Sequence, residues 1–144
     1  MEMSLTARIL LGALCAAAMT GDANANGAIA IGGNEKDKSQ GIAFGLSFNM
    51  ATNAGAELRA IQECLKIAVA PAEARADCKI IAHFTHEWIA VAMDRSAGAP
   101  GFGWSAGADQ ASAQSAARES CLETSPESRR AFCEVVQLYR DEQP

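Results

Sequence analysis

The sequence lacks several features on which common functions depend. It has 12 Lys and Arg against 17 Asp and Glu, a net charge of −5, and no polybasic run. Such an acidic balance argues against nucleic acid or an anionic lipid surface as the main partner. Beyond the first 25 residues, no stretch is long and apolar enough to span a bilayer. The mature chain is therefore expected to have no membrane span.

The first 25 residues have the pattern of a secretory signal peptide. Arg8 precedes an apolar run over residues 9–19, and Ala23-Asn24-Ala25 is a small-x-small cleavage site. We therefore expect cleavage after Ala25, a single mature domain over residues 26–144 and a periplasmic or secreted location.

Two other interpretations of this segment are open. An uncleaved membrane anchor is one, because Glu2 weakens the positive start that a signal peptide normally has. Lipidation of Cys15 is the other, although Leu14 stands where lipoprotein processing needs a small residue.

The mature sequence contains an internal repeat. Four blocks recur in the same order: Ala28–Ile31 with Ala90–Met93, Phe44–Ser47 with Phe102–Ser105, Ala56, Ala60 and Cys64 with Ala113, Ala117 and Cys121, and Asp77–Ile81 with Phe132–Val136. The spacing between copies changes only by short insertions or deletions in segments that read as loops. The pattern predicts a tandem duplication, with copy one at about residues 27–85 and copy two at about residues 88–140.

Each copy shows the same expected order of elements. A short run rich in Ile, Val and Ala predicts a buried strand, and a second strand ends near Ser47 or Ser105. A helix and a last strand follow, so the unit is strand, strand, helix, strand. Two such units predict an α+β domain with a mostly antiparallel sheet, two helices packed on it and pseudo-two-fold symmetry. The run Glu35–Lys38 predicts a solvated hairpin loop.

The two expected helices differ in their apolar faces. Thr52 or Asn53 is the expected cap of the first helix, and Asp109 that of the second. The first helix has an apolar stripe of the kind that usually faces a core, made by Ala54, Leu58, Ile61, Leu65 and Ala68. The second has a surface of small residues, made by Ala111, Ala113, Ala116, Ala117 and Ser120, which lets a helix sit close to its sheet.

The four cysteines of the mature chain predict disulfides, as in many short exported proteins. In each copy one cysteine ends the helix and the next begins the last strand. A repeat that once folded alone would close on itself, which favours Cys64–Cys78 and Cys121–Cys133. Each such loop would contribute about 3 kcal/mol in the chain-entropy model. The crossed pairing, Cys64–Cys121 with Cys78–Cys133, is the alternative.

Five short motifs carry a family resemblance: Gly27–Ala30, Phe44–Ser47, the helix positions Ala56, Ala60, Ile61 and Cys64, the strand Cys78–Ile81, and Ala90–Ala92. Through them the chain resembles a bacterial family catalogued as domain of unknown function 4189, over nearly all of its mature part. Similar proteins often have a cysteine just before the second Ala-Val-Ala block, where this chain has Glu87-Trp88-Ile89. An extra disulfide is therefore not expected. The resemblance implies export and this fold, and it implies no activity.

One motif resembles a catalytic one. Gly103-Trp104-Ser105-Ala106-Gly107 fits the G-x-S-x-G pattern of a nucleophile elbow. The hydrolase fold that uses it needs a longer chain, and its histidine follows the serine, whereas His83 and His86 precede Ser105. Copy one also loses the second glycine at the matching site. A turn glycine and a serine that satisfies backbone groups explain the motif more simply.

The two histidines form the other candidate cluster. His83 and His86, with Glu87, would suit zinc if a tight turn at Thr85 brought the imidazoles together. Copy two has Leu138 where copy one has His83, so two turn or surface histidines are the simpler interpretation. We therefore predict no metal, no cofactor and no catalytic residue, and keep a small hydrolase using Ser105 or His83 and His86 as the alternative function.

The strand-to-helix connection shows the sharpest divergence between the copies. Trp104 replaces Leu46 there, beside a glycine-rich stretch. Since loops carry function more often than the scaffold does, we predict a contact surface at Trp104–Ala108 with the Arg95–Gly101 hairpin. The expected contact residues are Phe102, Trp104, Ser105 and Arg95. The predicted function is an exported, non-enzymatic binding module for a protein or envelope component. An inhibitor or protective factor for an envelope hydrolase is one specific form of it.

Overall fold

The computed structural model describes residues 26–34 and 40–142. The expected signal peptide, its cleavage after Ala25 and the loop expected at Glu35–Lys38 lie outside these residues. The described elements are, in order, β1 (Asn26–Gly32), β2 (Ala43–Met50), α1 (Asn53–Lys66), α2 (Ala72–Ala76), β3 (Lys79–Phe84), β4 (Trp88–Met93), β5 (Phe102–Gly107), α3 (Gln110–Thr124), the 3₁₀ helix η2 (Glu127–Phe132) and β6 (Glu134–Arg140).

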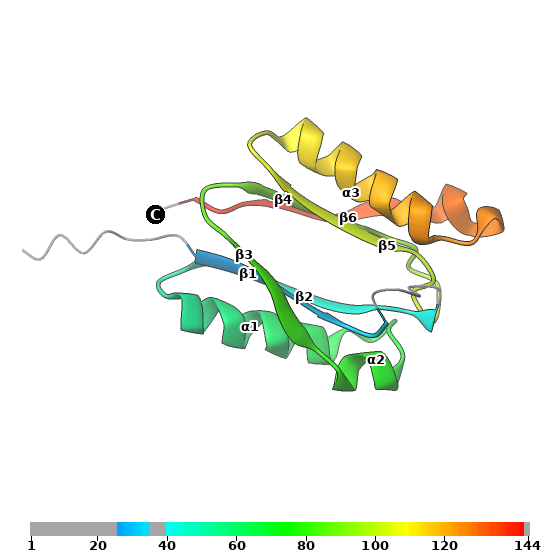
Figure 1. Cartoon of the computed structure of the whole chain (residues 1–144), viewed down its shortest axis with the longest axis horizontal. Coiled ribbons are helices and arrows are strands. Elements are labelled where there is room, and N and C mark those ends of the chain that lie inside the picture. Colours follow the sequence, from blue (N-terminus) through cyan, green and yellow to red (C-terminus); the bar gives the residue numbers. More distant parts are fainter. Residues whose placement is uncertain (1–25, 35–39, 143–144) are drawn as a thin grey trace, which may run out of the picture.

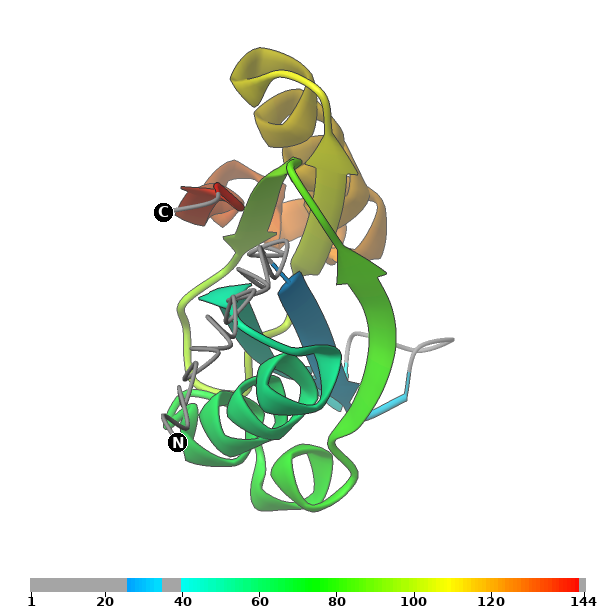
Figure 2. The same cartoon turned by 90° about the vertical axis from the view of Figure 1, so that its left-hand side faces the viewer.

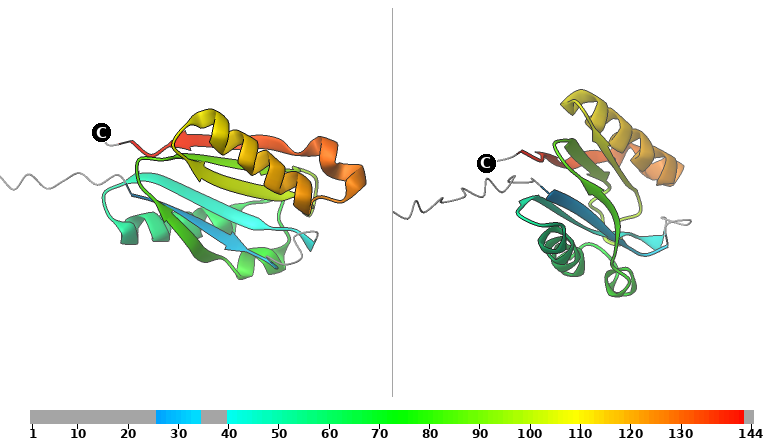
Figure 3. Two further views of the ribbon diagram at one scale, coloured as in Figure 1. Left: turned by 45° about the horizontal axis from the view of Figure 1, so that its top comes forward. Right: turned by 60° about the vertical axis from the view of Figure 1, so that its left-hand side comes forward.

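The strands form two antiparallel sheets, one from each copy. Their orders are β2-β1-β3 and β5-β4-β6, so the first strand of each copy lies in the middle of its sheet. The sheets lie face to face, with α1 and α2 outside one and α3 outside the other (Figures 1 and 3). The predicted α+β fold, with antiparallel strands and packed helices, is confirmed. The strands divide between two sheets, giving four layers in place of a single sheet with its helices.

The alternation of large and small side chains on the central strands explains the four layers. On β1, Ile29 and Ile31 point into the space between the sheets, and Ala28 and Ala30 point at α1. On β4, Val91 and Met93 likewise face the other sheet. Both faces of each central strand are apolar, so both must be covered. A facing sheet covers the large side chains and a helix covers the small ones.

Both copies contribute to the core between the sheets. Its buried members are Ile29, Ile31, Ile42, Phe44, Leu46 and Phe84 from copy one and Ile89, Val91, Met93, Ala99 and Phe102 from copy two. The rings of Phe44 and Phe102, which occupy matching positions, meet with centroids 5.3 Å apart. Neither copy could bury this face alone, so the two sheets depend on each other.

The repeat extends to the hydrogen-bond register. Ala28 pairs with Ser47 on β2, and Ala90 pairs with Ser105 on β5. The pairing with the last strand shifts between Ile29 and Ala30 in copy one, and at the matching step between Val91 and Ala92 in copy two. A shared irregularity is a stronger mark of duplication than shared apolar residues, because a bulge is a specific backbone feature.

The helix caps are as predicted, but the apolar stripe of α1 is not. Thr52 accepts from the amide of Gly55 at 3.0 Å, and Asp109 accepts from that of Ser112 at 2.9 Å. The prediction that the Leu58 stripe faces the core is wrong, because Leu58 is 61% exposed and Leu65 49%. The residues that α1 buries are Ala56, Ala60 and Cys64, and α3 buries Ala113, Ala117 and Cys121 in the same way.

A glycine on the strand beneath each helix explains why small residues are buried. A Cβ added at Gly45 would lie 2.0 Å from the carbonyl oxygen of Ala60. A Cβ added at Gly103 would lie 2.3 Å from that of Ala117. The helix backbone therefore rests directly on the strand, where only Ala and Cys side chains fit. The leucines of α1 are too large for this contact and turn outward.

The disulfides are Cys64–Cys78 and Cys121–Cys133, as the repeat predicted, and the crossed pairing is not formed. Each ties the end of a helix to the start of the last strand of the same copy. Two disulfides in so short a chain are compatible with an extracellular or periplasmic location. Within the described ranges, no helix is long and apolar enough to cross a membrane.

Candidate binding groove

The four residues predicted as contact residues lie in different environments. Phe102 has no exposed surface, so the prediction that it contacts a partner is wrong, and the ring belongs to the core between the sheets. Trp104 is half-buried and packs against the edge of that core. Ser105 is half-buried, and its hydroxyl donates to the carbonyl of Ala106 at 3.4 Å. Arg95 is exposed.

The Arg95–Gly101 loop and the Gly107–Ala108 end of the predicted turn lie at opposite ends of β5. Strand β5 continues through Gly107, so the stretch after Trp104 is a strand and not the predicted turn. The Arg95–Gly101 loop leads into the start of β5, whereas α3 begins after the other end of this strand (Figure 1). The loop also packs on copy one, because Gly98 donates its amide to the carbonyl of Val69 at 3.0 Å and Ala99 is fully buried.

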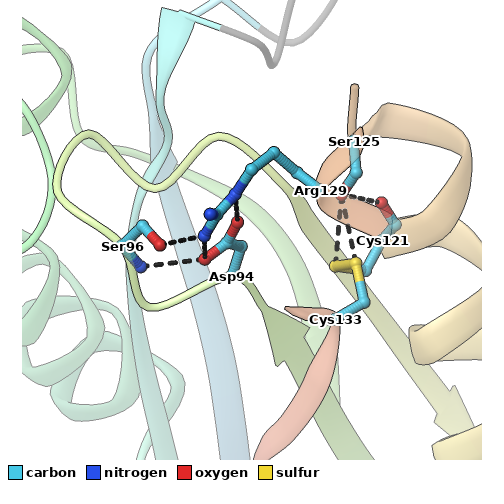
Figure 4. Close-up of polar contacts among 6 residues, drawn as sticks. All are labelled: Asp94, Ser96, Cys121, Ser125, Arg129 and Cys133. Carbon is cyan, nitrogen blue, oxygen red and sulfur yellow. Dashed lines mark hydrogen bonds and ion pairs between the residues drawn. A yellow bond between two sulfur atoms is a disulfide. The ribbon is translucent and has the colours of Figure 1, made fainter. Parts of the chain in front are cut away.

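An ion pair between the buried Asp94 and the half-buried Arg129 holds the start of that loop. Arg129 of η2 donates to both carboxylate oxygens of Asp94, at 2.7 and 2.9 Å, and also to the hydroxyl of Ser96 (Figure 4). The hydrogen bonds from Arg129, and more weakly those from Ser96, lower the pKa of Asp94 to about 2 against the effect of burial. Because Asp94 is 1% exposed and fully paired, this cluster fixes the loop and offers no free group to a ligand.

The candidate catalytic residues lie on different layers. Ser105 alternates with Trp104 and Ala106, which face the other sheet, so it points toward α3. His83 faces α1, with its Nε2 2.7 Å from Glu57 Oε1. Both sheets therefore separate the Ser105 hydroxyl from this imidazole. In copy one the matching Ser47 is 2% exposed, accepts from the amide of Ala28 and donates to the carbonyl of Ala56.

His86 and the metal hypothesis complete the sequence candidates. His86 lies in the turn between the copies with φ 58°, and its amide donates to Asp141 at 3.3 Å. Across the residues that the structure describes, no group of three His, Cys, Asp or Glu side chains is arranged to hold a metal ion.

A groove of about 550 Å³ runs along β2, the edge strand of the first sheet. Five consecutive residues of β2, Phe44 to Phe48, line it. Successive side chains of a strand point to opposite faces, so a hollow on one face would be lined by every second residue. Contact with consecutive residues means that the groove follows the outer edge of the strand, the side on which no further described strand is paired.

Charged side chains of α1 form one wall of this β2 groove. Arg59 lies 2.9 Å from the carboxylate of Glu63, and Lys66 lies 3.9 Å from it. One carboxylate thus stands between two cations, all partly solvent-exposed, which leaves one positive charge in excess on the wall. This wall is therefore positively charged, although the chain as a whole has a net charge of −5.

The opposite wall comes from β6, the edge strand of the second sheet. Tyr139 stacks on Phe48 of β2 with ring centroids 4.2 Å apart, which joins the two sheets at this edge. Beside it, Gln137 has a buried side-chain oxygen, Oε1, for which the described residues provide no hydrogen-bond partner. Buried acceptors are almost always satisfied, so this oxygen is a group to which an N–H or O–H of a ligand could donate.

The C-terminal segment is held against the end of β2 at Asn49. The fully buried carboxylate of Asp141 accepts from the amide of Asn49 at 2.6 Å and from that of His86 at 3.3 Å. Asn49 in turn accepts from the amide of Glu142 at 2.7 Å. The sequence analysis did not predict this clamp. Its only local signal is Asp141, which comes shortly after the last predicted strand.

The matching edge of copy two, β5, has different side chains. Superposing the repeats puts Ala116, Ser120 and Glu123 of α3 where α1 has Arg59, Glu63 and Lys66. Trp104 stands in place of Leu46, and Ala82 and Phe84 of β3 stand in place of Gln137 and Tyr139. The β5 edge therefore lacks the cations and the amide of the β2 groove.

Two facing three-stranded sheets, a helix over each and one disulfide per copy define a duplicated, disulfide-stapled α+β domain with an open strand edge. The family model described as Domain of unknown function (DUF4189) matches residues 26–139. The chain belongs to this family. Comparison with curated proteins and with solved structures gives no match.

Proposed function

We propose that the protein is an exported, non-enzymatic binding module that works in the periplasm or after secretion and holds its partner in the β2 groove. The partner is a protein or another component of the cell envelope. The signal-like start of the sequence and the two disulfides support export. An inhibitor or protective factor for an envelope hydrolase is the specific form in which such a module would act.

The observation that carries the proposal is the buried acceptor Oε1 of Gln137 in a groove with aromatic and charged walls. A ligand N–H or O–H that donates to Oε1 would add a buried hydrogen bond, which stabilises by about 0.5–1.5 kcal/mol net. Grooves of this volume with a few convergent polar groups are the usual form of a binding site.

The alternative function, a small hydrolase, has less support. Ser105 and His83 face opposite outer layers, and the Nε2 of His83 lies beside Glu57. A general base must reach the proton that it removes, either directly or through one water. A hydrolase would therefore need residues other than a Ser105–His83 pair.

Site-specific photo-crosslinking tests the proposed function. A photoreactive side chain is placed at Lys66, beside the groove, and in a second protein at Glu123, the matching position of copy two. Exposed to envelope extract, the Lys66 protein should form a discrete adduct that the Glu123 protein does not form. The adduct should disappear in a Tyr139→Ala background whose circular dichroism is unchanged. Equal adducts from both positions, or none from either, would refute the groove as a binding site.

A further inference from the structure

Resting on this proposed function, we infer that the occupant of the β2 groove is an extended peptide segment that adds to β2 as a further strand. Its side chains alternate between acidic and apolar. The juxtaposition that points to it is an open strand edge with a cationic wall on one side and an aromatic wall on the other.

The first step is that β2 is an edge strand without charged residues or proline. Its eight residues, Ala43–Met50, include no charged residue and no proline. Edge strands normally use such residues to prevent another strand from pairing with them. The other edge strand at this groove, β6, has Glu134 and Arg140, and β3 has Lys79. The regular stretch of β2, Ala43–Ser47, lacks those features, and the register irregularity lies beyond it, toward Met50, so this stretch is suited to accept a strand.

The second step concerns which groups line the edge. The groove touches consecutive β2 residues, so its floor is the outer backbone of the strand and not one face of the sheet. Addition of a strand supplies main-chain hydrogen bonds as the source of affinity. The lateral walls then decide which side chains the added strand must have.

The third step assigns those side chains. Successive residues of an added strand would point alternately toward α1 and toward β6, because the strand lies in the plane of the first sheet. On the α1 side they meet Arg59 and Lys66, which share the single carboxylate of Glu63. On the β6 side they meet Tyr139 and the amide of Gln137. Acidic residues fit the first wall and apolar or amide residues fit the second.

The fourth step limits the length and the place of the added strand. The amide of Asn49 already donates to Asp141, so the continuous stretch of β2 that lines the groove and is left for an added strand is Phe44 to Phe48. At about 3.3 Å per residue, five residues cover this span. The β5 edge offers Glu123 in place of Lys66 and no cation in place of Arg59, so an acidic strand is selected for copy one.

Synthetic peptides test this inference on the purified, disulfide-bonded protein. The probe is a set of capped seven-residue peptides in which glutamate or aspartate alternates with valine, phenylalanine or glutamine. Control peptides have the same composition with the acidic residues in one block. Alternating peptides should bind, by calorimetry, at least about tenfold more tightly than block peptides, and should shift the amide NMR signals of β2 and not those of β5. Equal affinity of the two sets would overturn the inference.

Alternate N-methylation of the best peptide tests strand addition itself. In a strand, every second N–H points to the same side, so methylation of one alternate set should abolish binding while methylation of the other is tolerated. A loss that does not depend on the set methylated would overturn strand addition. The double variant Arg59→Gln with Lys66→Gln should weaken binding about tenfold or more, and the control Arg118→Gln on α3 should not.

Failure of this inference differs from failure of the proposed function. If no alternating peptide binds while the Lys66 crosslink to a partner persists, the groove binds something other than a peptide strand and the inference is wrong. If the peptides do not bind and the crosslink is absent as well, both proposals are wrong.

Discussion

Copy one and copy two have the same backbone fold, and β2 and β5 are their matching edge strands. The side chains around these two edges differ. The copies share strand register, a bulge, a glycine beneath each helix and a disulfide. They differ in the residues that surround the outer strand. One edge has cations, an amide and a stacked tyrosine, and the other has Trp104. Close backbone contacts thus preserve residues in both copies, and open edges are where the copies are free to differ.

A second comparison concerns the corner after each central strand. In copy one this corner is Gly32, where a Cβ would lie 1.9 Å from the carbonyl oxygen of Ala74 on α2. In copy two the matching residue is Asp94, which pairs with Arg129 of η2 (Figure 4). The corner is therefore held against α2 by close packing in copy one, and against η2 by an ion pair in copy two. Figure 2, viewed along the sheets, shows the two copies as separate halves, each with its own helices.

The largest expected effect comes from filling the helix–strand contact. Gly45→Ala and Gly103→Ala should each lower the free energy of unfolding by at least about 4 kcal/mol, or prevent folding, because the added methyl would overlap helix backbone. Urea denaturation measures this. Gly107→Ala is the control, since its Cβ would lie 3.6 Å from the nearest atom, and it should change the stability by less than about 1 kcal/mol. A tolerated Gly45→Ala would contradict the shared close contact.

Removing the disulfides should affect the two copies almost equally. The paired variants Cys64→Ala with Cys78→Ala and Cys121→Ala with Cys133→Ala open loops with sequence separations of 14 and 12. Each should lose about 3 kcal/mol in the chain-entropy model. The measurement is denaturant unfolding of each pair variant beside the intact protein. A difference of more than about 1 kcal/mol between them would show that the copies are not energetically equivalent.

The ion pair should make copy two sensitive to acid. Since the folded pKa of Asp94 is about 2 against 3.8 in the unfolded chain, the pair stabilises the fold fully above pH 4. That stability disappears as the pH falls toward 2. The shift corresponds to about 2 kcal/mol. Asp94→Asn should therefore lose about that amount at pH 7, and its stability should depend less on pH between 4 and 2.

The control for this prediction is Asp109→Asn. Asp109 is an exposed helix cap whose pKa is lowered by hydrogen bonds from Ser112, so the variant keeps a capping oxygen and removes a carboxylate whose pKa is lowered in the folded state. It should retain the pH dependence that Asp94→Asn loses. If both variants unfold with the same pH profile as the unmodified protein, the Asp94–Arg129 pair contributes nothing measurable.

Much of the fold could be predicted because each local signal occurs in both copies of the repeat. The caps Thr52 and Asp109, and the disulfide partners, follow from local signals that the repeat confirms. The outward position of Leu58 could not be predicted. Helical spacing shows that α1 has an apolar stripe, but not which face of the helix packs on the sheet. That choice depends on Gly45, which lies on another element and admits only small residues.

The candidate site was harder to predict than the fold. The Trp104 stretch contains glycines and reads as a turn, although β4 pairs with it as far as Gly107. The β2 groove combines α1, β2 and β6, and Gln137 and Tyr139 are near the end of the chain, about 90 residues beyond Phe48 in the sequence. No local pattern links such distant segments. Their meeting follows from the two sheets facing each other, which the sequence-based prediction of one sheet with two helices did not include.

The smallest expected effect comes from giving copy two the residue of copy one. Trp104 is half-buried against the core, and leucine occupies the matching position 46. Trp104→Leu should therefore cost about 1 kcal/mol of stability, less than truncation to alanine, because the fold already accepts leucine there. Binding of the alternating peptides to the β2 groove should not change. The sequence-based hypothesis that Trp104 itself contacts a partner stays a prediction, and the same variant tests it. A loss of about 2 kcal/mol in partner affinity with stability unchanged would assign the contact to the β5 edge and remove the contrast between the two edges.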